Sequence, residues 1–174
     1  MLSLRRWIAN TLAGLSPPTR AFAWRRTLWR LAGVDVGARA KILSSVRIWT
    51  SGPVEIGPDT FIGHEVLIVG GTAPIKIGAR CDLAPRVCLA SGTHDEGNGE
   101  RAAGKGRSEP INVGDGVWIG AGSTVTAGAT IGRSSIVGAG SLVRGEIPGD
   151  VVVAGVPARM IRARDYALEQ VDAS

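Results

Sequence analysis

The sequence has few of the residues that usually build aromatic cores, metal sites or disulfide frameworks. Besides five tryptophans it has three aromatic residues, and it has two histidines and two cysteines among 174 residues. No run of eighteen apolar residues is present, so no transmembrane helix is expected. So few large rings argue against a core of aromatic side chains. Two cysteines are expected as reduced thiols in or near the core, which favours a cytoplasmic location.

The first 34 residues contain no acidic side chain, although they carry six arginines and three tryptophans. Residues 21–31 are expected to form an amphipathic helix, and Pro17 and Pro18 separate it from an earlier short helix. This basic segment either caps an open end of the fold or lies on an anionic membrane surface, and the two roles are compatible. The second role would place the protein at the inner face of the membrane. The rest of the chain is not basic, so nucleic-acid binding is not expected.

An aliphatic residue recurs every six positions through most of the chain. A period of six fits neither a helix nor a half-buried strand, and it is typical of a parallel β-helix. Three hexapeptides make a coil of eighteen residues, so fifteen such positions predict five coils. These anchors are Val36, Ile42, Ile48, Ile56, Ile62, Ile68, Ile77, Leu83, Leu89, Val113, Ile119, Val125, Ile131, Val137 and Val143. Small or β-branched residues at the fifth position of most units are also expected to point inward.

The repeat divides the chain into three parts. Residues 1–34 form the basic helical segment, 35–148 the β-helix, and 149–174 a C-terminal segment that closes the β-helix and includes a short helix. The longest interruption of the period, residues 90–112, is polar and glycine-rich and is expected to be an exposed loop. Long loops on rigid scaffolds often carry function, and His94 lies near the start of this one.

Three segments of the sequence resemble the hexapeptide-repeat acyltransferases, most closely the maltose, galactoside and colanic-acid-type O-acetyltransferases. They are LAPRVCLASGTHD, EPINVGDGVWIGAGSTVTAGATIGRSSIVGAGSLV and GDVVVAGVPARMIR, and the resemblance covers residues 25–163. It implies an all-β, left-handed parallel β-helix that assembles as a homotrimer, with active sites between subunits. It also implies acetyl-CoA as the acyl donor and no metal.

The resemblance assigns the catalytic base to His94. An imidazole is suited to take a proton from a sugar hydroxyl and return it to the departing thiolate. The oxyanion is expected to accept hydrogen bonds from backbone N–H groups of the turn at Gly120 and Ala121. The acceptor is expected to be a sugar hydroxyl in surface polysaccharide or glycan synthesis. The alternatives are a small-molecule acceptor (a free sugar, serine or an antibiotic) and a non-catalytic scaffold.

The same resemblance suggests residues for the donor and the acceptor. Those expected to contact coenzyme A are Trp118, Ala121, Ala139, Gly140, Arg144, Arg159 and Arg162. Each arginine is otherwise a solvated surface charge, and Trp118 is otherwise a groove or subunit contact. His64, Glu65 and Asp95 are candidates for acceptor binding, with plain surface placement as the alternative for the first two. Asp95 has two further candidate roles, ordering the loop and orienting the imidazole.

A zinc enzyme of the γ-carbonic anhydrase kind is the rival reading of the same repeat. Catalytic zinc there requires three histidine ligands. The sequence offers only His64 and His94, and the repeat places them on different faces. This alternative is therefore not favoured.

Overall fold

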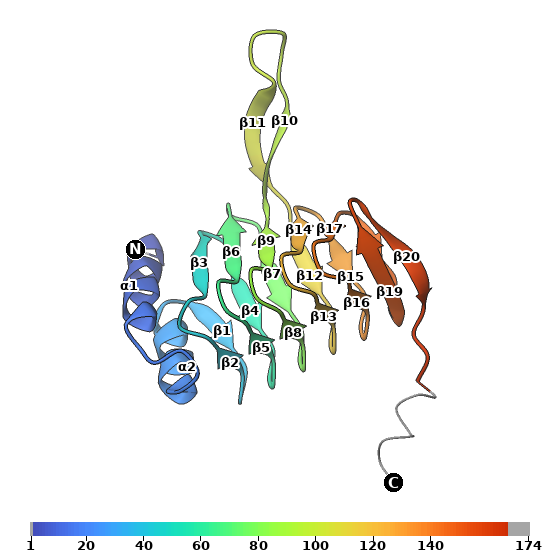
Figure 1. The fold of residues 1–174 in the computed structure, drawn as a ribbon. Helices are drawn as coiled ribbons and strands as arrows, with labels where there is room; N and C mark the ends of the chain where they lie inside the picture. Colours follow the sequence, from blue (N-terminus) through green and yellow to red (C-terminus); the bar gives the residue numbers. More distant parts are fainter. Residues whose placement is uncertain (1, 167–174) are drawn as a thin grey trace.

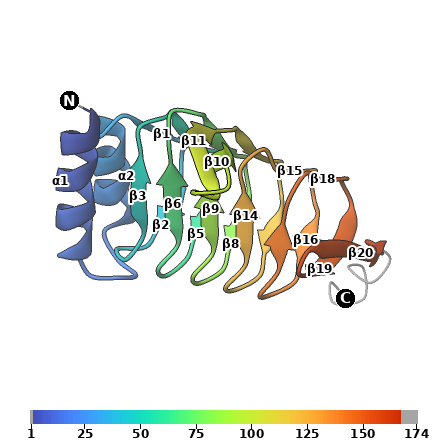
Figure 2. The ribbon, with the colours of Figure 1, turned by 90° about the horizontal axis from the view of Figure 1, so that it is seen from above.

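The computed structural model describes residues 2–166 and shows a left-handed parallel β-helix capped by two helices (Figure 1). Three sheets form the faces of a triangular prism, and each coil adds one strand to each sheet. A β-hairpin projects away from the prism, and the helices cover the end nearest the N-terminus (Figure 2). The fold predicted from the six-residue period is therefore confirmed.

The three faces are named sheets A, B and C in the order in which the chain visits them. Sheet A contains β1 (Val34–Val36), β4 (Val54–Ile56), β7 (Ile75–Ile77), β12 (Ile111–Val113), β15 (Thr130–Ile131) and β18 (Glu146–Ile147). Sheet B contains β2 (Lys41–Ile42), β5 (Phe61–Ile62), β8 (Asp82–Leu83), β13 (Trp118–Ile119), β16 (Ile136–Val137), β19 (Val151–Gly155) and β20 (Ala158–Ala163). Sheet C contains β3 (Arg47–Thr50), β6 (Leu67–Gly70), β9 (Cys88–Ala90), β14 (Thr124–Thr126) and β17 (Leu142–Val143).

The interior of the prism is filled as the repeat predicted. All fifteen aliphatic anchors are buried, and none is more than 4% exposed. The small residues at the fifth position are buried as well: Ala40, Val46, Thr60, Val66, Cys81, Val87, Val117, Ser123, Ala129, Ser135 and Ser141. One large and one small side chain per hexapeptide thus fill the narrow core. The five predicted coils are present, and β18 and β19 add a sixth, incomplete turn.

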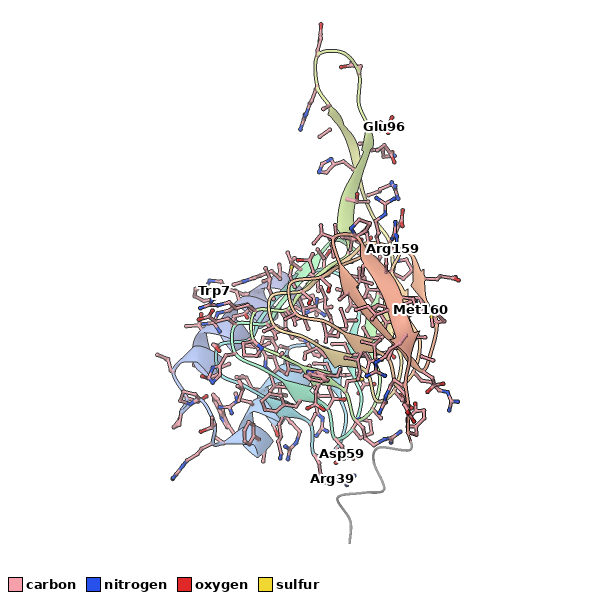
Figure 3. The ribbon with its side chains drawn as sticks, turned by 45° about the vertical axis from the view of Figure 1, so that its right-hand side comes forward. Trp7, Arg39, Asp59, Glu96, Arg159 and Met160 are labelled. Atoms are coloured by element: carbon pink, nitrogen blue, oxygen red, sulfur yellow. The ribbon has the colours of Figure 1, made fainter. Side chains whose placement is uncertain are left out.

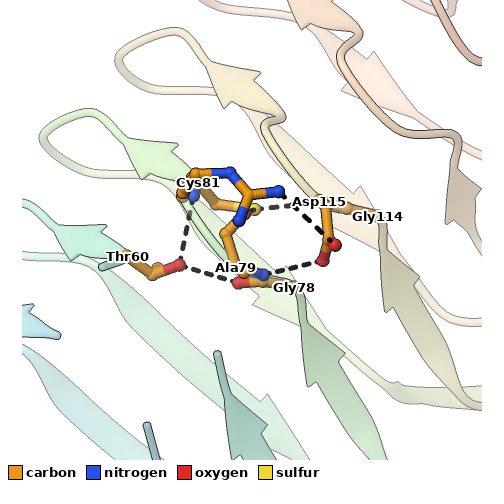
Figure 4. Close-up of polar contacts among 7 residues, drawn as sticks. Thr60, Gly78, Ala79, Cys81, Gly114 and Asp115 are labelled. Carbon is orange, nitrogen blue, oxygen red and sulfur yellow. Dashed lines mark hydrogen bonds and ion pairs between the residues drawn. The ribbon is translucent and has the colours of Figure 1, made fainter. Parts of the chain in front are cut away.

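Hydrogen bonds between coils satisfy the polar groups at the corners. At the corner between sheets A and B, the Thr60 hydroxyl donates to the Gly78 carbonyl at 2.7 Å and accepts from the Cys81 N–H at 3.1 Å (Figure 4). The Asp115 carboxylate accepts from the Ala79 N–H at 2.8 Å. Buried polar groups without such partners would cost stability. Residues from three successive coils therefore hold this corner together.

Every change in repeat length falls on one edge of the prism. We call the three edges AB, BC and CA after the sheets that they join. The two extra residues before Ile56, the three before Ile77 and the excursion before Val113 all lie between a strand of sheet C and the next strand of sheet A. Edges AB and BC keep constant spacing up to β17. Edge CA is therefore the variable edge, and it carries the hairpin.

Two helices close the end of the prism, which confirms the capping role expected for the N-terminal segment. They are α1 (Leu2–Gly14) and α2 (Phe22–Leu31). Asn10 pairs with the backbone of Ile48, donating to its carbonyl and accepting from its N–H at 3.0 Å each. In this way a side chain completes the ladder that a preceding coil would otherwise supply. Neither helix is long and apolar enough to cross a membrane.

Arginines satisfy further carbonyl groups of the first coil. Arg25 is fully buried and donates to the carbonyls of Ile42, at 2.6 Å, Pro17 and Pro18, and to the Ser16 hydroxyl. Arg6 donates to the carbonyls of Thr50 and Gly52, Arg26 to that of Ala40, and Arg30 to that of Val36. Burial lowers the pKa of both Arg6 and Arg25. Most of the basic side chains of this segment are therefore part of the cap.

The C-terminal segment closes the solenoid with strands in its described part. β20 turns back after the Val156–Pro157 peptide and pairs antiparallel with β19. The short helix expected within residues 149–174 is therefore not found up to Tyr166, and residues 167–174 lie outside the described part. An antiparallel strand satisfies the exposed edge of sheet B, for which a helix offers no backbone partners.

Replacing a capping arginine should destabilise the whole solenoid. Arg25→Met keeps most of the side-chain volume but leaves the Ile42, Pro17 and Pro18 carbonyls without donors. We expect a loss of about 3 kcal/mol in the free energy of unfolding, measured by urea denaturation. The matched variant Arg20→Met, at an exposed position, should change it by no more than about 0.5 kcal/mol. Equal effects of the two substitutions would contradict the capping role.

Candidate functional site

His94 lies on a β-hairpin, in the segment that the sequence predicted to be an exposed loop. The hairpin consists of β10 (Gly92–Glu96) and β11 (Ala103–Ser108), which pair antiparallel and place His94 opposite Gly106. The side chain of His94 is exposed. Strand pairing gives this interruption of the repeat a defined geometry, and it holds the imidazole beside edge CA.

One contact determines which nitrogen of His94 carries the proton. Its Nδ1 lies 3.1 Å from the carbonyl oxygen of Gly104, on the opposite strand. A carbonyl oxygen only accepts hydrogen bonds, so Nδ1 must be the donor. In the neutral imidazole this leaves Nε2 with a free lone pair. The hairpin therefore presents His94 in the tautomer that a general base requires.

Asp95, the neighbour of His94, contacts another part of the hairpin. Its carboxylate lies 2.6 Å from Nε of Arg107, and the same guanidinium also pairs with Glu109. Of the roles considered for Asp95, these contacts support ordering of the hairpin, because they link β10 to β11 and to the segment that returns to the prism. No hydrogen bond or ion pair between Asp95 and the His94 ring is found among the described residues.

A hollow of about 660 Å³ opens beside His94. It is lined by Gly71, Thr72, Gly92, Thr93, His94, Gly106, Arg107 and Ser108. The Ser108 hydroxyl accepts hydrogen bonds from the N–H groups of Thr72 and Ala73 at 3.1 Å each. These contacts fix the base of β11 to the turn after β6. Sequence reasoning did not identify Ser108, Thr72 or Arg107, because their proximity arises only when the hairpin is paired.

Gly120 and Ala121 begin a tight turn on edge BC, but only one of their N–H groups is free. The Gly120 N–H donates to the Val137 carbonyl at 2.7 Å as part of the ladder between coils. For the Ala121 N–H, no acceptor is found among residues 2–166. The turn closes with Ser123 N–H donating to Gly120 at 3.3 Å, and Gly122 adopts a φ of +69°. This geometry, a type II turn with Ala121 at its second position, leaves Ala121 as the candidate oxyanion donor.

Other candidates lie along the same edge. Ala139 and Gly140 occupy the corresponding turn of the next coil, where the Gly140 N–H donates to the Ala121 carbonyl at 2.9 Å. His64, Glu65 and Ala121 line a hollow of about 390 Å³. His64 contacts the Ser45 hydroxyl, and Glu65 pairs with Arg86 at 2.8 Å. The hydrogen bond from Arg86 lowers the pKa of Glu65, so its carboxylate is charged.

The tryptophan and the three arginines suggested for the donor are spread over the C-terminal half. Trp118 is 52% exposed on the outer face of sheet B. Arg159 and Arg162 lie on β20, and Arg159 is opposite Ala154 near the end of edge BC. Arg144 follows β17 and lies on edge CA, away from the other two. None of the three forms an ion pair with a carboxylate in the described part of the chain.

Within one chain, the structure does not bring His94 and Ala121 together. His94 belongs to the excursion on edge CA, whereas Ala121 lies on edge BC, with the whole of sheet C between them. The hollows that they line share no residue. His64 and Glu65, suggested as acceptor contacts, lie with Ala121 and not with His94. The candidate site is therefore divided between two edges of the prism.

The described residues contain neither a reactive cysteine thiolate nor a metal-binding cluster. Burial raises the pKa of Cys81 and of Cys88, so both remain protonated thiols, as the sequence led us to expect. In residues 2–166 there is no group of three His, Cys, Asp or Glu side chains that would hold a metal ion. His64 and His94 themselves lie on different edges.

Comparison with known proteins gives consistent relatives. The family model "Bacterial transferase hexapeptide (six repeats)" matches residues 110–145. Galactoside O-acetyltransferase of Escherichia coli (strain K12) is 35% identical over 138 residues, which are 79% of this chain and 68% of that protein. A protein of the same organism named for colanic acid biosynthesis, the acetyltransferase WcaF, is 31% identical over 158 residues, 91% of this chain and 85% of its own.

A solved structure extends the likeness to three dimensions. The hexapeptide-repeat-containing acetyltransferase of Vibrio cholerae O1 biovar eltor, in complex with acetyl coenzyme A, superposes with a TM-score of 0.68 at 25% identity. The match covers 94% of this chain and 87% of that one. Fold, repeat and relatives agree over nearly the whole described chain. The protein therefore belongs to the hexapeptide-repeat transferase family.

Proposed function

We propose that the protein is an acetyl-CoA-dependent O-acetyltransferase that modifies a sugar hydroxyl. The observation that carries the proposal is the contact of His94 Nδ1 with Gly104, which leaves Nε2 free to act as a base. The names of the two Escherichia coli relatives, a galactoside and a colanic acid acetyltransferase, support a sugar acceptor. The Vibrio cholerae relative with bound acetyl coenzyme A supports the donor.

In the proposed mechanism His94 acts twice. Nε2 takes the proton of the acceptor hydroxyl as that oxygen attacks the thioester carbonyl. The Ala121 N–H donates to the carbonyl oxygen as it becomes negative. When the carbon–sulfur bond breaks, His94 returns the proton to the departing thiolate. The products are the O-acetylated acceptor and free coenzyme A, and no covalent acyl-enzyme is required.

The donor is proposed to lie along edge BC. The turns of successive coils there carry small residues, Ala121 and then Ala139 and Gly140, past which a narrow pantetheine chain fits. Arg159 lies near the C-terminal end of this edge and has no carboxylate partner within residues 2–166, so its guanidinium is available to a phosphate. Arg144 lies on the other edge and is better placed to meet a donor that is held by a neighbouring subunit.

We propose that the complete site forms between two subunits. Hexapeptide-repeat acetyltransferases are typically trimers, and a trimer would let the hairpin of one protomer meet edge BC of the next. This arrangement would explain why His94 and Ala121 lie on different edges of a single chain. It would also place His64 and Glu65 of one protomer near His94 of its neighbour, where a sugar would be held.

Removing the imidazole should abolish transfer without affecting the fold. For His94→Ala we expect kcat to fall by about 10² to 10⁴, because only the base is lost. The thermal midpoint should not change, since the His94 side chain is exposed. Release of free thiol in the presence of a sugar acceptor measures the activity. A variant with wild-type kcat on its true acceptor would rule out the histidine mechanism.

Ala121→Pro should remove the oxyanion donor and keep the turn. Proline is favoured at the second position of a type II turn, and Pro85 already occupies the corresponding position one coil earlier, where its carbonyl accepts from Gly122. We expect kcat to fall by about 10² while the melting temperature is retained. The matched variant Ala121→Ser keeps the N–H and should keep most of the activity. If both variants are equally active, another group stabilises the oxyanion.

A mixture of the two inactive variants tests whether the site is shared. Co-expressed His94→Ala and Ala121→Pro chains with different tags yield mixed trimers that can be purified. Each mixed ring contains one interface that joins an intact His94 to an intact Ala121, so about one third of the wild-type activity should return. A site formed within one chain predicts no recovery at all.

A further inference from the structure

In the first helix of the cap, polar side chains face the protein and apolar side chains face outward, the reverse of an ordinary surface helix. Its inward side carries Arg6 and Asn10 together with two alanines, all buried against the solenoid. Its outward side carries Leu4, Ile8 and Leu12, and Leu15 follows directly after the helix. Surface helices of globular proteins normally place their large apolar residues on the inner side. The outer face of α1 is thus an apolar surface that the fold does not need.

The outward residues form one continuous stripe. At 100° per residue, positions 4, 8 and 12 fall on the same side of the helix, opposite Arg6 and Ala13, and Leu15 follows the last turn. The exposed fractions are 60% for Leu4, 41% for Ile8, 40% for Leu12 and 80% for Leu15. Contiguous exposed apolar area of this kind indicates an interaction surface.

Exposed aromatic residues of the cap add to this surface. Trp7 is 55% exposed and, with Leu4 and Trp49 of β3, lines an apolar groove of about 570 Å³. Trp24 and Leu31 of α2 are also exposed. Trp7 lies at the capped end of the prism, far from Arg159 and Met160 at the other end (Figure 3). The stripe of α1 and these neighbours are called the cap surface below.

The charge around the cap surface is of one sign. Four of the six arginines in this region donate to backbone carbonyls, and Arg5 and Arg20 remain exposed without a carboxylate partner in the described residues. No acidic residue occurs before Asp35. A second copy docked face to face would bring these cations together with nothing to neutralise them. An anionic surface is the complementary partner.

We propose that the cap surface docks on an anionic lipid bilayer. The Leu and Ile stripe would enter the boundary between headgroups and acyl chains, as amphipathic interfacial helices do. Trp7 and Trp24 suit the headgroup level, and Arg5 and Arg20 would pair with lipid phosphates. The sequence suggested membrane binding by a basic segment that also carries tryptophans. In the structure four of its six arginines donate to backbone carbonyls, and apolar side chains carry the contact.

This docking would bring the His94 hollow close to the membrane. Gly70 lines the apolar groove at the cap, and the next residue, Gly71, lines the hollow beside His94. An acceptor sugar attached to a lipid would then reach His94 while its lipid part stays in or near the bilayer. Membrane docking itself does not depend on the proposed chemistry, because it rests on the cap alone.

Flotation with lipid vesicles tests the proposal on the full chain. Vesicles with equal parts of phosphatidylcholine and phosphatidylglycerol should carry the wild-type protein, and phosphatidylcholine vesicles should carry less. Ile8→Asp should weaken binding about tenfold or more, because it replaces apolar burial by a charge. The matched control Ile161→Asp makes the same change at a 64% exposed position on β20 and should bind like the wild type.

Three results would overturn the proposal. The first is an Ile8→Asp variant that binds anionic vesicles as well as Ile161→Asp does, and the second is a wild-type protein that binds neither kind of vesicle. The third is a smaller assembly of Ile8→Asp in sedimentation velocity without lipid, which would show that a second copy covers the stripe. Acetyl transfer to a soluble sugar should be equal in wild type and Ile8→Asp, so a failure of docking is distinguishable from a failure of the proposed activity.

Discussion

Each coil of this protein depends on its neighbours for its backbone hydrogen bonds, and the rest of the structure follows from that constraint. Coils in the middle of the prism satisfy each other, but the two ends cannot. At one end Asn10 and Arg25 supply the missing partners, and at the other β20 folds back on β19. The cap is therefore part of the ladder. This explains why most of the arginines in this segment donate hydrogen bonds to backbone carbonyls.

The sequence predicted the interior and the helical cap, but not the contacts that close the two ends, for a physical reason. Aliphatic residues at a fixed interval are buried when they all face the core of the β-helix. The positions of Ile62 and Ile119 in the core could therefore be predicted from the sequence. The partners of Arg25 and Arg6 are carbonyl oxygens, which every residue has, and no side-chain pattern marks them. The C-terminal strand β20 could not be predicted either, because it pairs antiparallel with β19 and has no repeat of its own.

The candidate site shows a similar division. His94 stood out because it lies in the segment that interrupts the six-residue period, and the hairpin keeps its side chain exposed. Choosing between Gly120 and Ala121 required the ladder, since only the register with Val137 shows which N–H is already used. The separation of His94 from Ala121 follows from the same repeat register that places His64 and His94 on different faces, because the register decides which edge each hexapeptide reaches. A trimer would bring His94 of one subunit close to Ala121 of the next.

All differences in coil length are confined to edge CA, and this has a consequence for how such a protein changes over time. Residues inserted there leave the core and the other two edges untouched, so the hairpin can lengthen, shorten or alter its sequence at little cost to folding. Edge BC has no such freedom, because its turns stack directly on one another. Edge CA can thus vary in length and sequence while edge BC stays constant, within one small repeat.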